Sequence, residues 1–343
     1  ASLLRGLRSP RGTPLQGGAP PPVWGRRERV HADPNIPAKR ERKAKQGGCG
    51  PGTRSGARRA NRMPANRTSR PILSRRSKFV TSASGSPSGS SAWVDHIPVL
   101  WFEPPAPRAV RRLVLFLPNL SGTKEGMIPF LQDLAAAGFV ALSLDPWQHG
   151  ERGTESQAEI LSRVFGNFRR HMWPILGQTT LDTMRVIDWA VAALDVQPDV
   201  YIGGLSMGGD IAVAAAGIDH RIQRVAAVVA TPDWLRPGMH DLFDRHRLLP
   251  PGEPDAYAKY FYEHLNPMTH LAAYAHGPAI YFVCGERDTH VPPDGALRFQ
   301  AALREAHPSA ADNVQVKLVP GMDHLAVRDS ALWWPDCLAW LTR

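Results

Sequence analysis

A ten-residue stretch decides the fold, and it reads Val200-Tyr201-Ile202-Gly203-Gly204-Leu205-Ser206-Met207-Gly208-Gly209. Its apolar beginning predicts a buried strand over Val200–Leu205, and the residues that follow predict a helix over Met207–Ala216. Between them stands G-x-S-x-G, the pattern of a serine on a tight strand-to-helix turn. The glycines let the chain pass closely, and the helix N-terminus favours negative charge near the serine oxygen. Ser206 is therefore the candidate nucleophile, with a Gly-rich turn of no chemical role as the alternative.

Apolar runs alternate with amphipathic segments on both sides of this stretch. Several runs are continuously apolar, as in strands buried on both faces of a parallel sheet. The predicted strands are Ile97–Phe102, Arg112–Leu117, Phe139–Leu144, Val200–Leu205, Val225–Ala230, Ala279–Cys284 and Val314–Val319. The predicted helices are Lys124–Ala137, Leu176–Leu194, Met207–Ala216, Asp294–Ala306 and Leu325–Leu341. This alternation predicts an α/β fold with a mostly parallel, doubly wound sheet, whose functional residues gather at the carboxyl ends of its strands.

One segment, 231–271, breaks the alternation. It contains no predicted strand but is rich in aromatic residues, namely Trp234, Phe243, Tyr257, Tyr260, Phe261 and Tyr262. Because it follows the strand Val225–Ala230, it should lie at the carboxyl edge of the sheet. We expect a helical, cap-like insertion that covers the active site, and an ordinary long crossover is the alternative.

The partners of a catalytic serine follow it in the order acid, then histidine. Asp288 and His324 each stand just after a predicted strand, in Cys284-Gly285-Glu286-Arg287-Asp288 and Pro320-Gly321-Met322-Asp323-His324. His324 would take the proton of Ser206 and pass it to the leaving group, while Asp288 would fix its tautomer. Glu286 is the competing acid and His290 the competing histidine.

An oxyanion hole requires two backbone N–H groups that point to the developing charge. One is expected from Met207, directly after the nucleophile. The other is expected from the loop after Arg112–Leu117, where Leu120 is the candidate donor. Trp147 and Trp234 are candidates for the lining of an apolar acyl pocket. No nucleotide-binding glycine loop, H-E-x-x-H motif or repeated metal-ligand spacing is present, so neither a cofactor nor a metal is predicted.

These motifs resemble the α/β-hydrolase superfamily, in particular serine esterases of the dienelactone-hydrolase and prolyl-oligopeptidase-like groups. The resemblance runs from about Leu113 to Leu341 and includes His149-Gly150-Glu151-Arg152-Gly153, which is similar to the H-G-E-R-G loop of one such group. It implies the α/β-hydrolase fold and a loop shaped by Gly150, Glu151 and Arg152, with His149 as a structural residue. Relatives usually begin the oxyanion loop with His-Gly, where this chain has Pro118-Asn119. Asn tolerates a positive φ, so Asn119 is expected to preserve the turn.

The N-terminal part of the chain differs from the rest in composition. Residues 1–80 hold 20 Lys and Arg residues and three acidic residues, a net charge of +17, whereas residues 81–343 carry −7. With ten Gly, ten Pro and few apolar residues, 1–80 is expected to be a disordered tail, and 81–94 a Ser/Gly linker to a catalytic domain at 95–343. A transit peptide, a nucleic-acid-binding tail and upstream sequence translated by mistake are the three interpretations of this tail.

The sequence as a whole predicts a cofactor-independent serine hydrolase that cleaves small-molecule carboxylic esters through an acyl-enzyme. A peptidase, a thioesterase and a lactone hydrolase share this mechanism, and a non-catalytic ligand-binding protein is the rival from another class. Three cysteines, Cys49, Cys284 and Cys337, are too few for a disulfide framework, and no apolar run could span a membrane. A cytoplasmic location is expected, with targeting to an organelle through the Arg-rich N-terminus as the alternative.

Overall fold

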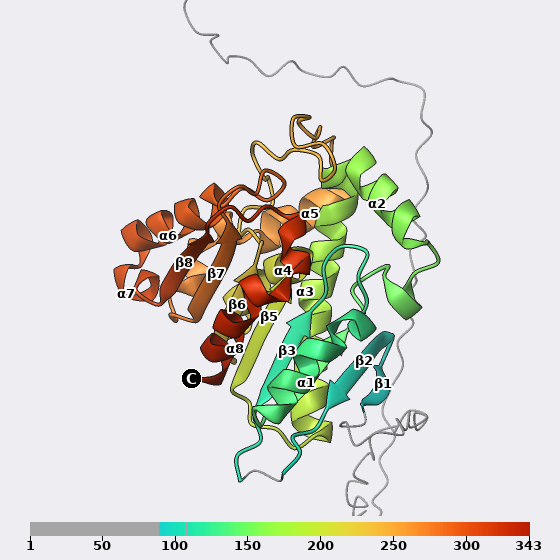
Figure 1. The fold of residues 1–343 in the computed structure, drawn as a ribbon, viewed down its shortest axis with the longest axis vertical. Coiled ribbons are helices and arrows are strands. Elements are labelled where there is room, and N and C mark those ends of the chain that lie inside the picture. Colours follow the sequence, from blue (N-terminus) through green and yellow to red (C-terminus); the bar gives the residue numbers. More distant parts are fainter. Residues whose placement is uncertain (1–88, 107–108) are drawn as a thin grey trace, which may run out of the picture. The chain divides into compact units, whose positions relative to one another are not determined.

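The computed structural model describes residues 89–106 and 109–343, so the predictions for the tail, including Cys49, lie outside the described residues. In this part of the chain a single sheet has the strand order β1-β2-β4-β3-β5-β6-β7-β8 (Figure 1). The first two strands pair antiparallel, β2 pairs antiparallel with β4, and the remaining pairs from β4 to β8 are parallel. The strands are β1 (Ser90–Val94), β2 (Ile97–Phe102), β3 (Leu113–Leu117), β4 (Val140–Leu144), β5 (Val200–Leu205), β6 (Ile222–Val228), β7 (Ala279–Gly285) and β8 (Val314–Val319).

Helices cover both faces of the sheet (Figure 1). They are α1 (Ile128–Ala136), α2 (Gln157–Gly166), α3 (Phe168–Ala193), α4 (Met207–Ile218), α5 (Ala256–Leu265), α6 (Asp294–Ala306), α7 (Pro308–Ala311) and α8 (Trp334–Thr342). Short 3₁₀ turns are η1 (Lys124–Met127), η2 (Gly150–Arg152), η3 (Pro267–Thr269), η4 (Leu271–Tyr274), η5 (Leu325–Arg328) and η6 (Ser330–Leu332). This is the predicted α/β-hydrolase fold, a mostly parallel sheet flanked by helices, and the prediction is confirmed.

Strand β3 shows why the central runs are continuously apolar. Leu113, Leu115 and Leu117 belong to the hydrophobic cluster that includes residues of α3, α4 and α6. Val114 and Phe116 alternate with them and belong to the cluster on the other face, with residues of α1 and α8. Because side chains of a strand point alternately to the two faces, every position of β3 is buried.

Two predicted elements differ from the structure. The linker predicted over 81–94 is wrong at its end, because Ser90–Val94 forms the edge strand β1, and the sheet therefore begins before residue 95. The helix predicted over Leu325–Leu341 is instead two 3₁₀ turns followed by α8. Pro335 lies in the first turn of α8, where its missing N–H removes no helical hydrogen bond.

The aromatic-rich segment 231–271 is less helical than expected. It contains the helix α5 and the 3₁₀ turn η3, and the residues before α5 form turns joined by the isolated bridge His240–Leu248. Helix α5 packs on α3 so closely that a Cβ at Gly177 would lie 2.1 Å from the Phe261 ring. The loops between β6 and α5 lie beyond the carboxyl ends of the strands (Figure 1). This segment is therefore one packed helix on long loops, not a helical cap.

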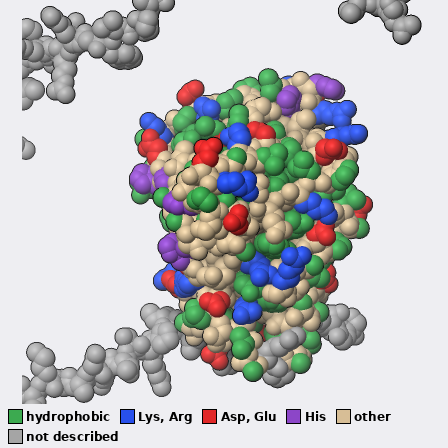
Figure 2. All heavy atoms as spheres, turned by 90° about the vertical axis from the view of Figure 1, so that its left-hand side faces the viewer, with side chains coloured by type: hydrophobic (Ala, Val, Ile, Leu, Met, Phe, Trp, Pro, Cys, Tyr) green, Lys and Arg blue, Asp and Glu red, His purple; other side chains and the backbone are tan. Residues whose placement is uncertain are grey.

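Basic and acidic side chains are interspersed on the face shown in Figure 2, rather than gathered by sign. This agrees with the sequence, in which the excess of positive charge belongs to residues 1–80 and the rest of the chain carries both signs. No helix among the described residues is long and apolar enough to cross a membrane.

Candidate active site

Ser206 lies at the turn from β5 into α4, with φ 49° and ψ −113°. Its backbone N–H donates to the Val228 carbonyl at 2.8 Å, and the residue keeps 7% of its surface exposed. A Cβ at Gly204 would lie 2.4 Å from the Gly208 carbonyl carbon, so this turn excludes a side chain there. The strained backbone of Ser206 and the close approach of Gly204 to Gly208 are expected for a serine presented on a turn at the end of a strand.

Asp288 and His324 are brought together by the loops after β7 and β8. The Nδ1 atom of His324 lies 2.8 Å from Oδ2 of Asp288. The other carboxylate oxygen of Asp288 accepts the backbone N–H groups of His290 at 2.9 Å and Val291 at 2.8 Å. Asp288 is 3% exposed. Because His324 Nδ1 and the two backbone N–H groups donate to it, both oxygens of its carboxylate are held by hydrogen bonds. A proton on Nδ1 leaves Nε2 of His324 as the basic atom.

The residues that were alternatives to Asp288 and His324 contact other partners. The Glu286 carboxylate accepts the Gly321 N–H at 2.9 Å, and Asp323 accepts the Ala326 N–H at 2.9 Å, so both shape the loop that carries His324. His290 packs edge-on against the His324 ring, with centroids 4.8 Å apart. Burial, together with the nearby His324 and Arg236, holds the pKa of His290 well below its usual value. His290 is therefore a neutral packing partner in this arrangement.

Ser206 and His324 lie at the same edge of the sheet, because β5, β7 and β8 are parallel and both residues follow strand ends. No hydrogen bond joins Ser206 Oγ or His324 Nε2 to another residue in the described part of the chain. Hydrogen bonds of a catalytic pair are often long without substrate and tighten when it binds.

The two candidate oxyanion donors lie on segments that pack together. A Cβ at Gly208 would lie 2.3 Å from the Leu117 carbonyl oxygen and 2.7 Å from that of Pro118. The loop that carries Leu120 therefore lies against the first turn of α4, where Met207 stands. Within residues 89–106 and 109–343, the N–H groups of Leu120 and Met207 have no backbone or side-chain acceptor.

A buried lysine in this region was not predicted from the sequence. Lys124 follows the oxyanion loop, and its Nζ lies 2.8 Å from Asp145 and 2.7 Å from Glu151. Burial lowers the pKa of Lys124, but hydrogen bonds to Asp145, Glu125 and Glu151 outweigh this and raise it above its usual value. The Asp145 carboxylate also accepts the backbone N–H groups of Lys124 at 2.9 Å and Glu151 at 3.0 Å. Asp145 thus joins the oxyanion loop to the H-G-E-R-G loop.

The two candidate pocket tryptophans have other contacts. The side chain of Trp234 is fully buried within the larger hydrophobic cluster, and its carbonyl accepts the indole N–H of Trp173 at 2.9 Å. The expectation that Trp234 faces an open acyl pocket is therefore wrong in this structure. Trp147 is half-buried, and its ring packs against the Arg152 guanidinium and the His96 ring.

A comparison with known protein families shows which class this geometry belongs to. The model of the prolyl oligopeptidase family matches residues 166–343, more than half of the chain, including Ser206, Asp288 and His324. The chain belongs to the prolyl oligopeptidase family. This match places it among the serine hydrolases. No group of three or more metal-binding side chains occurs among the residues that the structure describes.

Individual relatives agree with this assignment. Over 96 residues the chain is 33% identical to YtaP of Bacillus subtilis (strain 168), which is named as a hydrolase. That match covers 27% of this chain and 30% of the length of YtaP. A Klebsiella pneumoniae protein described as a dienelactone hydrolase has a TM-score of 0.53 at 16% identity, over 74% of this chain and 98% of that one. A puromycin-hydrolysing peptidase of Mycobacterium tuberculosis has a TM-score of 0.53 at 18% identity, over 74% of this chain and 39% of that one. At these identities the solved structures show a shared fold.

Proposed function

We propose that this family member hydrolyses carboxylic esters through an acyl-enzyme on Ser206. The observation that carries the proposal is the 2.8 Å contact between Asp288 and His324, on the same sheet edge as the strained Ser206 turn. It supplies an oriented base at the sheet edge where the Ser206 hydroxyl is presented, and nucleophilic catalysis by serine needs both groups.

The proposed reaction has two halves. Ser206 Oγ attacks the ester carbonyl while His324 Nε2 takes its proton, and the resulting oxyanion is held by the N–H groups of Leu120 and Met207. His324 then gives the proton to the leaving alcohol as the C–O bond breaks. In the second half, His324 takes a proton from the water that attacks the acyl-enzyme, and returns it to Ser206 Oγ as the bond to the acyl group breaks and the carboxylic acid leaves. Asp288 stays ionised and stabilises the imidazolium in both halves.

Esters are proposed over peptides because of the extent of the structural matches. The shared fold accounts for 98% of the protein described as a dienelactone hydrolase but only 39% of the puromycin-hydrolysing peptidase. The protein described as a dienelactone hydrolase thus consists almost entirely of this fold, whereas most of the peptidase lies outside it.

A substrate panel tests this proposal. We expect turnover of p-nitrophenyl esters of graded acyl length, with kcat/KM varying gradually, since one methylene in an apolar pocket contributes about 1–3 kcal/mol. Aminoacyl p-nitroanilides and acyl thioesters should be slower. A protein that cleaves the anilides faster than every ester would be a peptidase. One that binds esters without turnover would be the ligand-binding rival.

A further inference from the structure

The backbones of the loops that carry Asp288 and His324 are fixed to each other. The N–H of Arg287 donates to the Met322 carbonyl at 2.9 Å, and a Cβ at Gly285 would lie 2.5 Å from the same carbonyl oxygen. The position of the basic nitrogen therefore depends on the His324 side chain. Its hydrogen bond to Asp288 fixes Nδ1, at one corner of the ring. Nε2 lies across the ring and could still swing about that contact, because the second torsion of a histidine side chain has broad energy wells.

A second ring limits this swing. The imidazole of His290 packs edge-to-face against that of His324, with the ring centroids 4.8 Å apart and the ring planes at 65°. An edge-to-face arrangement at this separation is favourable for two aromatic rings. Rotation of the His324 ring toward His290 would bring atoms of the two rings into overlap. The contact therefore closes one side of the space in which the imidazole of His324 can move.

The buried side chain of His290 is itself held from several sides. Its backbone N–H donates to the Asp288 carboxylate at 2.9 Å, so its main chain is tied to the acid. Its Nδ1 lies 2.8 Å from the His240 carbonyl, in the segment after β6. The N–H of His240 in turn donates to the Thr289 carbonyl at 2.8 Å. Phe165 of α2 packs edge-to-face on the His290 ring, with the centroids 5.3 Å apart. His290 is thus a fixed side chain beside the base.

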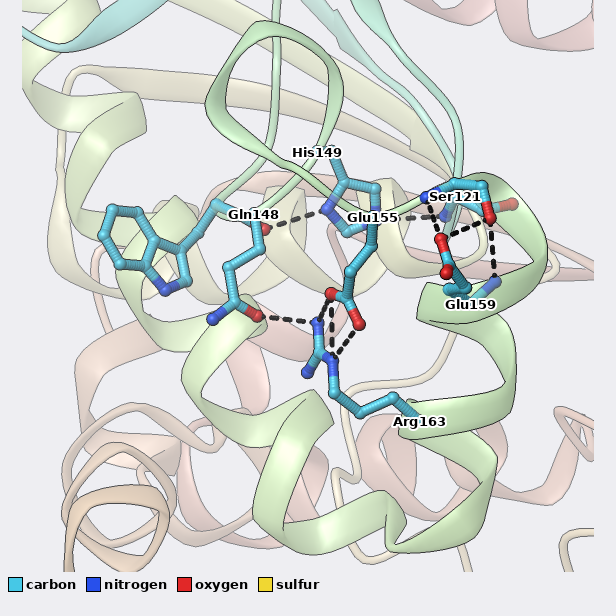
Figure 3. A network of polar contacts seen from close by, with 8 residues as sticks. Ser121, Gln148, His149, Glu155, Glu159 and Arg163 are labelled. Carbon is cyan, nitrogen blue, oxygen red and sulfur yellow. Dashed lines mark hydrogen bonds and ion pairs between the residues drawn. The ribbon is translucent and has the colours of Figure 1, made fainter.

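Helix α2, which carries Phe165, is attached to the loop after β4. The guanidinium of Arg163 donates to the Gln148 side chain at 3.0 Å and is paired with Glu155 (Figure 3). The buried side of the helix belongs to the larger hydrophobic cluster. Phe165 therefore supports His290 from a helix whose own position is fixed.

The ring of His290 supports the base without carrying a charge. The charged groups near it are Asp288 on its own loop, His324 on the loop after β8, and Arg236 after β6, which is paired with Asp210 of α4. Burial, together with His324 and Arg236, holds the pKa of His290 well below its usual value, although the carbonyl that accepts from Nδ1 favours the cation. With its single ring proton on Nδ1, His290 is neutral.

We propose that His290 is a positioning residue of the proposed ester hydrolase: its ring restrains the imidazole of His324, so that Nε2 keeps the position from which it takes the Ser206 proton. A misplacement near 1 Å in such a site costs about 10²-fold in rate. Because the supporting ring is neutral, it does not oppose the imidazolium that His324 becomes in each half of the reaction. The inference rests on the proposed function, since it assigns a role in the same site.

Two substitutions in the full chain separate the ring of His290 from its hydrogen bond to His240. His290→Gln keeps an N–H donor but has no ring, and we expect kcat for the best p-nitrophenyl ester to fall about 10²-fold with KM changed only about threefold. His290→Phe keeps a ring but has no donor, and its kcat should be at least about tenfold above that of His290→Gln. His276→Gln, which replaces an exposed ring stacked on His220, is the control and should match wild type.

Labelling of Ser206 by a fluorophosphonate distinguishes positioning from damage to the fold. Each kcat is expressed per labelled Ser206, so that unfolded molecules do not count. The rate of labelling should fall in parallel with kcat in His290→Gln, because both reactions need the same base. The acid limb of kcat/KM, which reports the pKa of His324 in the free enzyme, should not move to higher pH, as it would if a neighbouring cation had been removed.

Three results would overturn the inference. The first is a kcat per labelled site in His290→Gln that lies within about threefold of wild type, since His290 would then act on the fold alone. The second is a kcat in His290→Phe no higher than that in His290→Gln. The third is an acid limb that moves to higher pH in His290→Gln. A wild-type protein that neither cleaves esters nor reacts with the probe would instead overturn the proposed function.

Discussion

Gly208 and Leu117 meet without room for a methyl group, since a Cβ on residue 208 would lie 2.3 Å from the Leu117 carbonyl oxygen. This contact joins the helix that follows the nucleophile to the strand that leads into the oxyanion loop. Gly208→Ala should therefore separate the two proposed N–H donors and lower kcat by about 10²-fold or more, since an oxyanion donor contributes about that much. Gly126→Ala, where nothing lies within 4 Å of the new Cβ, is the matched control. Equal kcat values for the two variants would contradict the close-packing argument.

The choice of the acid can be tested by a pair of isosteric changes. Asp288→Asn should lower kcat by several orders of magnitude, because an amide donor next to Nδ1 favours the wrong tautomer of His324. Glu286→Gln should change kcat less than tenfold, because the hydrogen bond that its carboxylate forms within the described residues is to the Gly321 N–H and not to His324. Steady-state kinetics on one ester measure both. If Glu286→Gln lowered kcat more than Asp288→Asn did, Glu286 would be the acid that orients His324.

A buried ion pair lies one helical turn beyond the nucleophile. Asp210 of α4 contacts the Arg236 guanidinium, both side chains are almost fully buried, and Asp210 also accepts the Thr231 N–H at 2.7 Å. Arg236→Met leaves the carboxylate uncompensated, so the free energy of unfolding should fall by about 3–5 kcal/mol. Arg247→Met removes a pair whose cation is largely exposed and should cost less than about 1 kcal/mol. Urea denaturation compares the variants, and equal losses would argue against a structural role for Arg236.

Acid should destabilise the protein through its buried histidines. Burial lowers the pKa of His149 to about 4, compared with about 6.5 in an unfolded chain. Between these values the unfolded state binds more protons, so stability is fully present above pH 6.5 and is lost as pH falls toward 4. The loss from His149 is roughly 3 kcal/mol at most, because a tenfold difference in proton affinity between the folded and unfolded states corresponds to about 1.4 kcal/mol.

Melting temperatures at several pH values between 7.5 and 4.5 measure this dependence. His149→Gln, which does not titrate, should show a shallower fall than wild type. A remaining slope is expected from His290, whose pKa burial also lowers. Parallel curves for wild type and His149→Gln would show that His149 is not buried in its neutral form.

Much of the fold could be predicted because the central strands are buried on both faces. The apolar runs of β5 and β8 end where expected, and β6 begins earlier than predicted only because Gln223 and Arg224 interrupt the apolar pattern. Strand β1 was not predicted because it is short and begins with Ser90 and Ser91, which continue the preceding Ser/Gly-rich stretch of the sequence. Helix α2 was also missed, although Ser156 and Glu159 form a capping box that the sequence could have indicated.

The candidate site, like the fold, could be predicted only in part. Strand ends and motif order predicted Ser206, Asp288 and His324, because parallel strands bring their carboxyl ends to one edge. The support of the oxyanion loop depends on contacts between residues far apart in the chain, such as Ser121 with His149 and Lys124 with Asp145. The fully buried Trp234 shows the same limit, because an aromatic residue near a site packs into the core as readily as it lines a pocket.

The central claim is that Ser206 is the nucleophile, and the most direct test is the position of a covalent adduct. Native protein treated with a fluorophosphonate and digested should carry one phosphonyl group, assigned by tandem mass spectrometry to Ser206. Ser206→Ala should remain folded, lose the adduct and lose at least about 10³-fold in kcat, since the members of a triad act as a unit. An adduct on Ser121 or another serine, or ester turnover that survives in Ser206→Ala, would contradict the account.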